Sequence, residues 1–182
     1  MSDDPVATRY AQALFESAKA EDTLDETLEQ LVLLGTLVKD EAMLQRLLLN
    51  PGIDPEEKVR LLERTLHEAW SDLVNAFIRM VVIADRAVLL PEIAHALQAA
   101  VDVERNMLRA VVRSSHPMPQ VVLDRLRKAL EHREAQHVIL TSEVDPTLLG
   151  GFQLFLGNRV IDSSVRQSLH ELRERLTVVR VY

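Results

Sequence analysis

Hydrophobic residues recur every three or four positions along roughly the first 100 residues, the spacing expected of helices that bury one face. Short polar stretches separate these stripes, so six helices joined by short loops are predicted before about residue 105. The stripes comprise Ala7, Tyr10, Ala11, Leu14, Phe15 and Ala18; Leu24, Leu28, Leu31, Leu34 and Val38; Met43, Leu44, Leu47 and Leu48; Val59, Leu62 and Leu66; Leu73, Ala76, Phe77, Met80 and Ala84; and Ile93, Leu97 and Val101.

Residues typical of helix starts precede these stripes. Asp4-Pro5 and Asp54-Pro55 each place an N-cap oxygen before a proline at the first helical position. Thr23, with Glu26 three residues later, predicts a capping box. Further starts are expected at Ser71-Asp72 and Leu90-Pro91, and Asn50-Pro51-Gly52 is expected to end the third helix.

The fifth predicted helix differs from the others because its later part is apolar nearly all round. Val81, Val82 and Ile83 extend its stripe to other faces. A helix of this kind belongs at the centre of a bundle. Trp70, at its entry, is expected to be a packing anchor.

The pattern changes after about residue 105. Alternation predicts strands over residues 107–113 and 152–156, and residues 138–140 predict a third short strand. Gly157 opens a polar turn, followed by a helix that Asp162, Ser163 or Ser164 caps. Residues 120–133 predict a basic amphipathic helix that buries Val122, Leu126 and Leu130. The predicted fold is mainly α: a six-helix N-terminal bundle, residues 1–105, followed by a small C-terminal α/β domain, residues 106–182.

Charge divides the chain in the same place. The chain has 182 residues and a formal net charge of −7. Residues 1–105 hold 20 acidic and 10 basic residues, a balance of −10, whereas residues 106–182 hold 8 and 11, a balance of +3. This asymmetry fits two parts with different surfaces and different partners, and it fits equally two solvated surfaces that simply differ in charge.

Several kinds of protein are disfavoured by composition. The chain has no cysteine, which excludes disulfides and thiol chemistry. No apolar run approaches the roughly 18–20 residues of a membrane span, and the acidic N-terminus lacks the apolar region of a signal peptide. We therefore expect no direct membrane span.

No constellation of catalytic residues appears. The six histidines are scattered, and none forms a His-x-x-x-His pair. Gly150-Gly151 lacks the remaining residues of a phosphate-binding loop and leads into a strand, so a bulge or a close backbone approach is expected there. The residues predict an adaptor that is not an enzyme, with no catalytic, cofactor-binding or metal-binding residues.

Two alternatives stay open at this point. One is a small nucleotide-binding protein that uses the Gly150-Gly151 turn. The other is a nucleic-acid-binding helical protein, because the C-terminal part is basic, although aromatic residues for base stacking are missing. Its basic positions are Arg125, Arg127, Lys128 and Arg133 on one helix, and Arg166, His170 and Arg173 on another.

Motifs along nearly the whole chain resemble one family. The C-terminal stretch contains Asp145-Pro146, Gly150-Gly151, Gly157-Asn158, Val160-Ile161-Asp162 and Ser164-Val165-Arg166 in order. The opening ATRYAQALF and the segment LLLNPGIDPEEKVRLL match two further motifs, whereas Ile83-Ala84-Asp85-Arg86 replaces the usual Glu-Asn-x-Arg. Together they resemble the delta subunit of F-type ATP synthase, which is related to the mitochondrial oligomycin-sensitivity conferring protein.

This resemblance implies a non-catalytic stator subunit that connects the alpha/beta catalytic head to the peripheral stalk and resists rotor torque during proton-driven ATP synthesis. The N-terminal helix of an alpha subunit is implied to dock between the first and fifth helices, at Tyr10, Ala11, Ala13, Leu14, Asn75, Ile78 and Arg79. The C-terminal domain is implied to receive the C-terminal ends of the b subunits, with candidate contacts at Gly151, Val165, Arg166, Leu169, His170, Leu172 and Arg173.

The resemblance also implies a setting for the chain. It implies one copy per complex, held at the cytoplasmic face of the inner (plasma) membrane through the other subunits. It implies neither a cofactor nor a nucleic acid partner.

Overall fold

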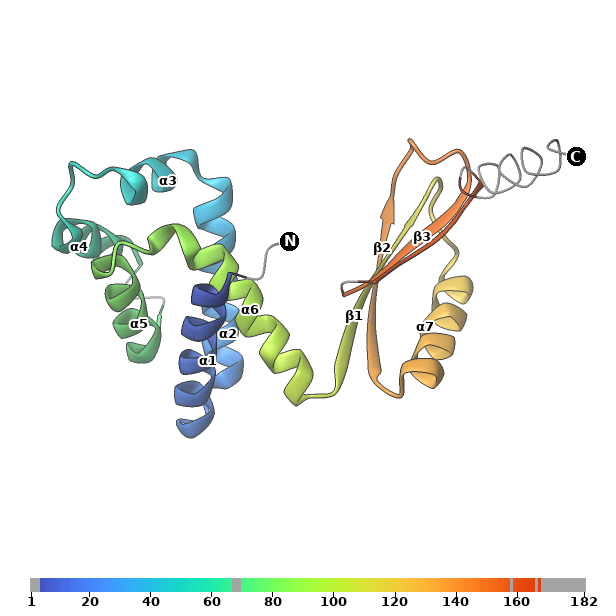
Figure 1. Cartoon of the computed structure of the whole chain (residues 1–182), viewed down its shortest axis with the longest axis horizontal. Helices are drawn as coiled ribbons and strands as arrows, with labels where there is room; N and C mark the ends of the chain where they lie inside the picture. The colour runs from blue at the N-terminus through green and yellow to red at the C-terminus, as the bar shows by residue number, and fades with distance from the viewer. Residues whose placement is uncertain (1–3, 67–69, 158, 166, 168–182) are drawn as a thin grey trace, which may run out of the picture. The chain divides into compact units, whose positions relative to one another are not determined.

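The computed structural model describes residues 4–66, 70–157, 159–165 and 167, with the backbone alone over 63–66 (Figure 1). The chain is mainly helical and carries a small four-stranded sheet towards its C-terminus. It divides into two compact units, Met1–Val101 and Asp102–Tyr182. Within the described ranges, no helix has the length and apolarity that crossing a bilayer requires.

The first unit is helical. Its helices bury their apolar stripes in one cluster, which includes Leu14, Leu31, Leu34, Ile93 and Leu97. This confirms the predicted inward faces of the first, second and sixth stripes. The elements are α1 (Pro5–Ala20), α2 (Leu24–Asp40), α3 (Ala42–Leu49), α4 (Pro55–Leu66), α5 (Asp72–Ile83), the 3-10 turn η2 (Ala87–Leu89) and α6 (Leu90–Glu104).

Three of the predicted caps are present in the structure, and one is not. Asp4 Oδ1 accepts from Val6 N at 2.8 Å, Asp54 Oδ1 accepts from Glu56 N at 2.8 Å, and Ser71 caps α5. The capping box at Thr23 is wrong, because its side chain makes no cap hydrogen bond. The Thr23 hydroxyl lies 3.5 Å from that of Thr27, a buried residue, so the hydroxyl pair replaces the cap.

Two predictions about buried faces are also wrong. Met43 is 85% exposed, so α3 buries Leu48 without it. The central position predicted for α5 fails as well, because Ala76 and Ala84 are exposed and Met80 is 47% exposed. α5 packs along one face only, which consists of Val74, Phe77, Ile78, Val81 and Val82. Trp70 is buried at the entry to this helix, as predicted.

The second unit combines helix α7 (Gln120–Glu134) with strands β1 (Met107–Ser114), β2 (His137–Val144), β3 (Gly151–Leu156) and β4 (Arg159–Ser164). The strand order is β2-β1-β3-β4. α7 connects the parallel pair β1 and β2, and β3 and β4 form an antiparallel hairpin. Figure 1 shows α7 alongside the sheet, where Leu126 and Leu130 pack on Ala110 and Val112. Val122 is 42% exposed, and Leu123 takes its predicted place.

The expected close backbone approach at Gly150-Gly151 is confirmed. Gly151 has φ +77°, and a Cβ there would overlap the Ser163 carbonyl oxygen and lie 2.9 Å from Ser164 Cα. Only glycine fits such a position, and it starts a strand instead of a phosphate-binding helix. The nucleotide-binding alternative therefore loses the feature that prompted it.

Of the three residues predicted to cap the helix after this hairpin, Ser164 occupies the N-cap position. Asp162 and Ser163 belong to β4, because they pair with Gln153 and Phe152 of β3. Ser164 provides the cap, since its Oγ accepts from Gln167 N at 3.3 Å, and Asp162 Oδ1 accepts from the Ser164 N–H at 2.8 Å. The rest of the predicted final helix lies outside the described residues.

Candidate protein-binding surfaces

Three of the residues implied to dock an alpha subunit have side chains buried within the first unit. Ala11, Leu14 and Ile78 are buried in its core. They support the surface from beneath and present no side chain to a partner. Tyr10 is half-buried and Ala13 is exposed, so these two remain at the surface of α1.

Two more of these residues, Asn75 and Arg79, make polar contacts. Arg79 Nη2 donates to Glu56 Oε2 of α4 at 2.9 Å. Asn75 Nδ2 donates to the Trp70 carbonyl oxygen at 3.3 Å. On the helical wheel, Asn75 and Arg79 share a side of α5 opposite Phe77, so that side is polar.

The side of α5 next to α1 is apolar. The rings of Tyr10 and Phe77 meet edge to face with centroids 6.3 Å apart, which places α1 against α5. On the helical wheel, Leu73, Ala76 and Met80 fall on the same side of α5 as Phe77 but further towards solvent. Ala76 and Met80 are exposed and Leu73 is half-buried. We define these three residues together with Tyr10 and Ala13 as the α1–α5 surface.

Sequence reasoning placed Leu73, Ala76 and Met80 in the core because an apolar residue at helical spacing is usually buried. The available signal was the apolar character of α5 on nearly all sides. When neighbouring helices do not cover all the apolar positions of a helix, the uncovered positions are available to a binding partner.

Of the residues implied to face the stalk, only Gly151 and Val165 are described. Gly151 serves the backbone approach to β4. Val165 is partly exposed, and its side chain lies over Gly150, where an added Cβ would meet Val165 Cγ2 at 3.2 Å. Arg166, Leu169, His170, Leu172 and Arg173 lie outside the described residues.

The sheet presents an apolar row on the face opposite α7. The strand registers align Thr141, Val111, Phe155 and Val160 across all four strands. Val111 and Phe155 are half-buried, and Val160 is 57% exposed. This row was not predicted, because it depends on registers between strands that are distant in sequence.

A polar row borders it on the same face. The registers align Glu143, Arg113, Gln153 and Asp162. Arg113 Nε donates to Glu143 Oε2 at 2.7 Å, and Gln153 Nε2 donates to Asp162 Oδ2 at 2.9 Å. The Arg113 guanidinium also lies over the Phe155 ring, 4.7 Å from its centroid. We call the two rows together the open sheet face.

The described side chains offer surfaces for binding. Among the residues the structure describes, no group of three His, Cys, Asp or Glu side chains is arranged to hold a metal ion. On α7, Arg127 lies 3.7 Å from Asp124, and Arg133 lies 3.5 Å from Glu134. These acidic neighbours reduce the positive charge on which the nucleic-acid alternative relied.

Comparisons with known proteins agree on one family. The family model for the ATP synthase delta (OSCP) subunit matches residues 6–176. The chain is 36% identical over 169 residues to ATP synthase subunit delta of Methylobacterium sp. (strain 4-46), covering 92% of this chain and 89% of that one. It is 33% identical over 171 residues to ATP synthase subunit delta of Caldanaerobacter subterraneus subsp. tengcongensis, covering 94% and 96%.

The fold has a counterpart among solved structures. A chain in the cryo-EM structure of the Toxoplasma gondii mitochondrial ATP synthase hexamer superposes with a TM-score of 0.75 at 20% identity, covering 96% of this chain and 98% of that one. The family is that of a structural, non-catalytic subunit of the ATP synthase complex. On the match to its model and the identity to these relatives, the chain belongs to the ATP synthase delta (OSCP) subunit family.

Proposed function

We propose that this chain ties the catalytic head of an ATP synthase to its peripheral stalk through two separate attachments. In this proposal, α1–α6 form a six-helix bundle that binds the N-terminal helix of an alpha subunit. The second unit binds the C-terminal ends of the b subunits. One copy sits in each complex, peripheral to the membrane at its cytoplasmic face.

The observation that carries the first attachment is the α1–α5 surface. Leu73, Ala76 and Met80 lie at helical spacing on α5, and exposed Ala13 on α1 has a side chain small enough for a close approach. An amphipathic helix that lays its apolar face on such a surface gains affinity from a few anchoring side chains. The acidic balance of residues 1–105 favours a partner helix with basic flanks.

The open sheet face supports the second attachment. Its row of Val111, Phe155 and Val160 provides apolar contact area. The adjoining Arg113 and Glu143 can pair with polar groups of the partner and so fix its position on the sheet. Linking two attachments through one chain raises the effective concentration of each. A connector of this kind resists torque by binding alone, so it requires no catalytic group.

The first attachment is tested with a synthetic peptide of the cognate alpha subunit's N-terminal helix. Calorimetry measures its affinity for the full chain and for Met80→Glu. A carboxylate within the apolar contact is expected to weaken binding about tenfold or more. The matched control is Met43→Glu, which changes an exposed methionine on α3 and is expected to bind as the unmodified chain does. Equal affinity of all three proteins would exclude the α1–α5 surface.

The second attachment is tested by co-purification with the cognate b subunits. Val160→Lys places a charge on the open sheet face and is expected to reduce the b subunit recovered. Val121→Lys places the same charge on an exposed position of α7 and serves as control. If Val160→Lys recovers as much b subunit as the control does, the stalk binds elsewhere on the chain.

A further inference from the structure

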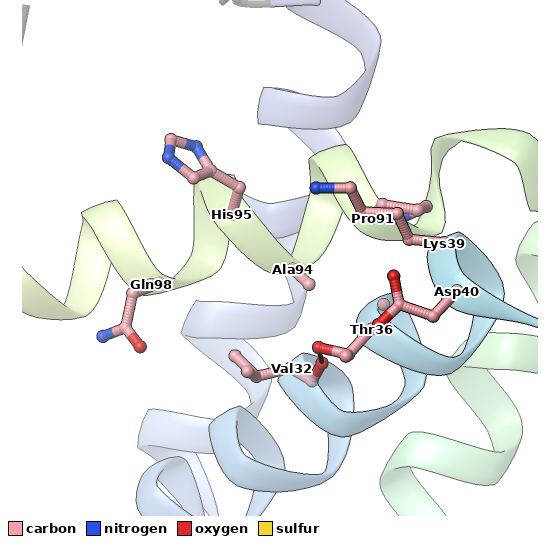
Figure 2. Close-up of a pocket in the computed structure, with 9 residues that line it drawn as sticks. Val32, Thr36, Lys39, Asp40, Pro91, Ala94, His95 and Gln98 are labelled. Carbon is pink, nitrogen blue, oxygen red and sulfur yellow. Dashed lines mark hydrogen bonds between the residues drawn. The ribbon is translucent and has the colours of Figure 1, made fainter. Parts of the chain in front are cut away.

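A pocket lies between α2 and α6, away from the residues of the α1–α5 surface. Figure 2 shows its apolar part, where Val32 of α2 faces Ala94 and Pro91 of α6. The pocket is open to solvent and has a volume of about 320 Å³, which is at the lower end of ligand-pocket volumes but ample for one long side chain. Gly35 lets the two helices approach, since a Cβ there would lie 3.0 Å from Ala94 Cβ.

Polar and charged groups surround this apolar part. Thr36, Lys39 and Asp40 come from α2, and His95 and Gln98 come from α6. In Figure 2 the Lys39 side chain extends over Pro91, and the Asp40 carboxylate turns towards the pocket. No ion pair among the described residues joins Lys39 or Asp40 to another side chain. A ligand of either charge therefore has a potential counter-ion.

The end of α2 decides the preferred charge. Asp40 is the last residue of α2, and Glu41 follows it as the C-cap. A helix C-terminus carries partial negative charge and unpaired carbonyl oxygens, so acidic residues there are unfavourable without a cation. Gln45 Nε2 donates to the Lys39 carbonyl oxygen and satisfies one of these acceptors. This end of the pocket favours a cationic hydrogen-bond donor.

The start of α6 lacks one of the backbone donors that a helix start usually offers to an anion. Pro91 has no N–H group, and η2 precedes α6 directly. The Leu90 N–H donates to the Ala87 carbonyl oxygen, and the Leu89 N–H donates to that of Arg86 at 2.9 Å. Because these donors are satisfied, an anion would depend mainly on the side chains of Lys39, His95 and Gln98.

We propose that this pocket binds an arginine side chain from a basic segment of a partner protein. The aliphatic stem packs on Val32 and Ala94, and the guanidinium meets the Asp40 carboxylate. An extended stem with a planar, multiply donating head suits an apolar pocket with an acceptor-rich end. The pocket lies on different helices from the α1–α5 surface, so this contact is additional to the alpha-subunit attachment.

Phenylguanidinium serves as the probe, because it joins an apolar ring to the same cationic head. It is titrated into the ¹⁵N-labelled full chain, with benzoate as the anionic counterpart, and amide chemical shifts are followed. Saturable shifts at Gly35, Thr36 and Ala94 with phenylguanidinium, and none with benzoate, are expected. Asp40→Asn is expected to weaken this binding about fivefold, as for a solvent-exposed ion pair.

Two variants make the test decisive. Glu57→Gln removes an exposed carboxylate of equal charge from α4, outside the pocket, and is expected to leave the affinity unchanged. Lys39→Met removes the competing cation and is expected to tighten phenylguanidinium binding. Benzoate shifts that disappear in Lys39→Met would overturn the proposal in favour of an anion site. Absence of saturable shifts, or equal affinity in Asp40→Asn and Glu57→Gln, would also overturn it.

Discussion

The two units reach stability in different ways. In the first unit, many buried residues from α1–α6 share one large cluster, so the loss of a single contact is spread over many neighbours. In the second unit, the buried core consists of Ala110, Val112, Leu130, Val138, Leu154 and Leu156, and strand registers hold it together. A small core that depends on register has fewer ways to accommodate a change. The second unit is therefore expected to depend more strongly on individual residues.

The largest effect is expected at Gly151. Gly151→Ala forces a Cβ against the Ser163 carbonyl oxygen in a backbone conformation with φ +77°. Separation of β3 from β4 is expected, with a loss of about 3 kcal/mol or more in the free energy of unfolding of the second unit. Hydrogen exchange on the full chain measures this as lost amide protection in β3 and β4, with the protection of α1 and α2 retained.

Gly157→Ala is the matched control. Gly157 also has positive φ, +54°, but an added Cβ meets nothing within 4 Å. Only the backbone preference is lost, at a cost of about 1 kcal/mol. Equal losses in the two variants would show that the close approach to β4 contributes nothing.

The first unit has its own sensitive point at Lys58, which is only 3% exposed. Its Nζ donates to the Leu48 carbonyl oxygen at 2.8 Å and thereby joins α4 to the end of α3. Lys58→Met keeps most of the volume but leaves that carbonyl oxygen unpaired, which is expected to cost about 1–3 kcal/mol. Urea unfolding measures the loss, and Lys39→Met, an exposed lysine on α2, is the control.

The comparison of the two units predicts that Lys58→Met lowers the free energy of unfolding less than Gly151→Ala does. If Lys58→Met instead unfolded the first unit outright, the large helical cluster would not be spreading the loss of one contact. The α3–α4 junction would then be as critical as the hairpin of the second unit.

The sequence predicted the faces of α1, α2 and α6 because helical periodicity is a local property. It failed at α5, because periodicity cannot decide which apolar positions the neighbours cover when a helix carries more of them than one face holds. At Asp162 and Ser163 the side chains have the chemistry of a helix cap, but pairing with β3 extends the strand through them. The open sheet face also depends on pairing between distant segments, so no local pattern predicted it.

The α1–α5 surface illustrates the same difference between what local sequence patterns predict and what packing between distant segments decides. The resemblance directed attention to α1 and α5 but assigned residues that the structure places in the core or towards α4, such as Ile78 and Arg79. Which residues lie at the surface follows from the contacts of Tyr10 with Phe77 and of Arg79 with Glu56. Those contacts depend on packing between helices, which the spacing of residues within one helix cannot predict.

The smallest effect on stability is expected at Arg113. Arg113 and Glu143 are both partly exposed, and pairs of this kind contribute about 0.2–1 kcal/mol. Arg113→Met is therefore expected to lower the free energy of unfolding by about 1 kcal/mol or less, with the loss shrinking at high salt. Recovery of b subunits should nevertheless fall, because Arg113 lies over Phe155 at the centre of the open sheet face.

Arg159→Met separates binding from stability. Arg159 Nη2 also donates to a carboxylate, Glu134 Oε2, at 2.6 Å, and this pair joins β4 to α7. A similar small loss of stability is expected there, with unchanged recovery of b subunits, because the register places Arg159 on the same face as Leu154 and Leu156, opposite the open sheet face. If both variants reduced recovery equally, general weakening of the second unit would explain the result. A selective loss in Arg113→Met would mean that the polar row serves the partner more than the fold.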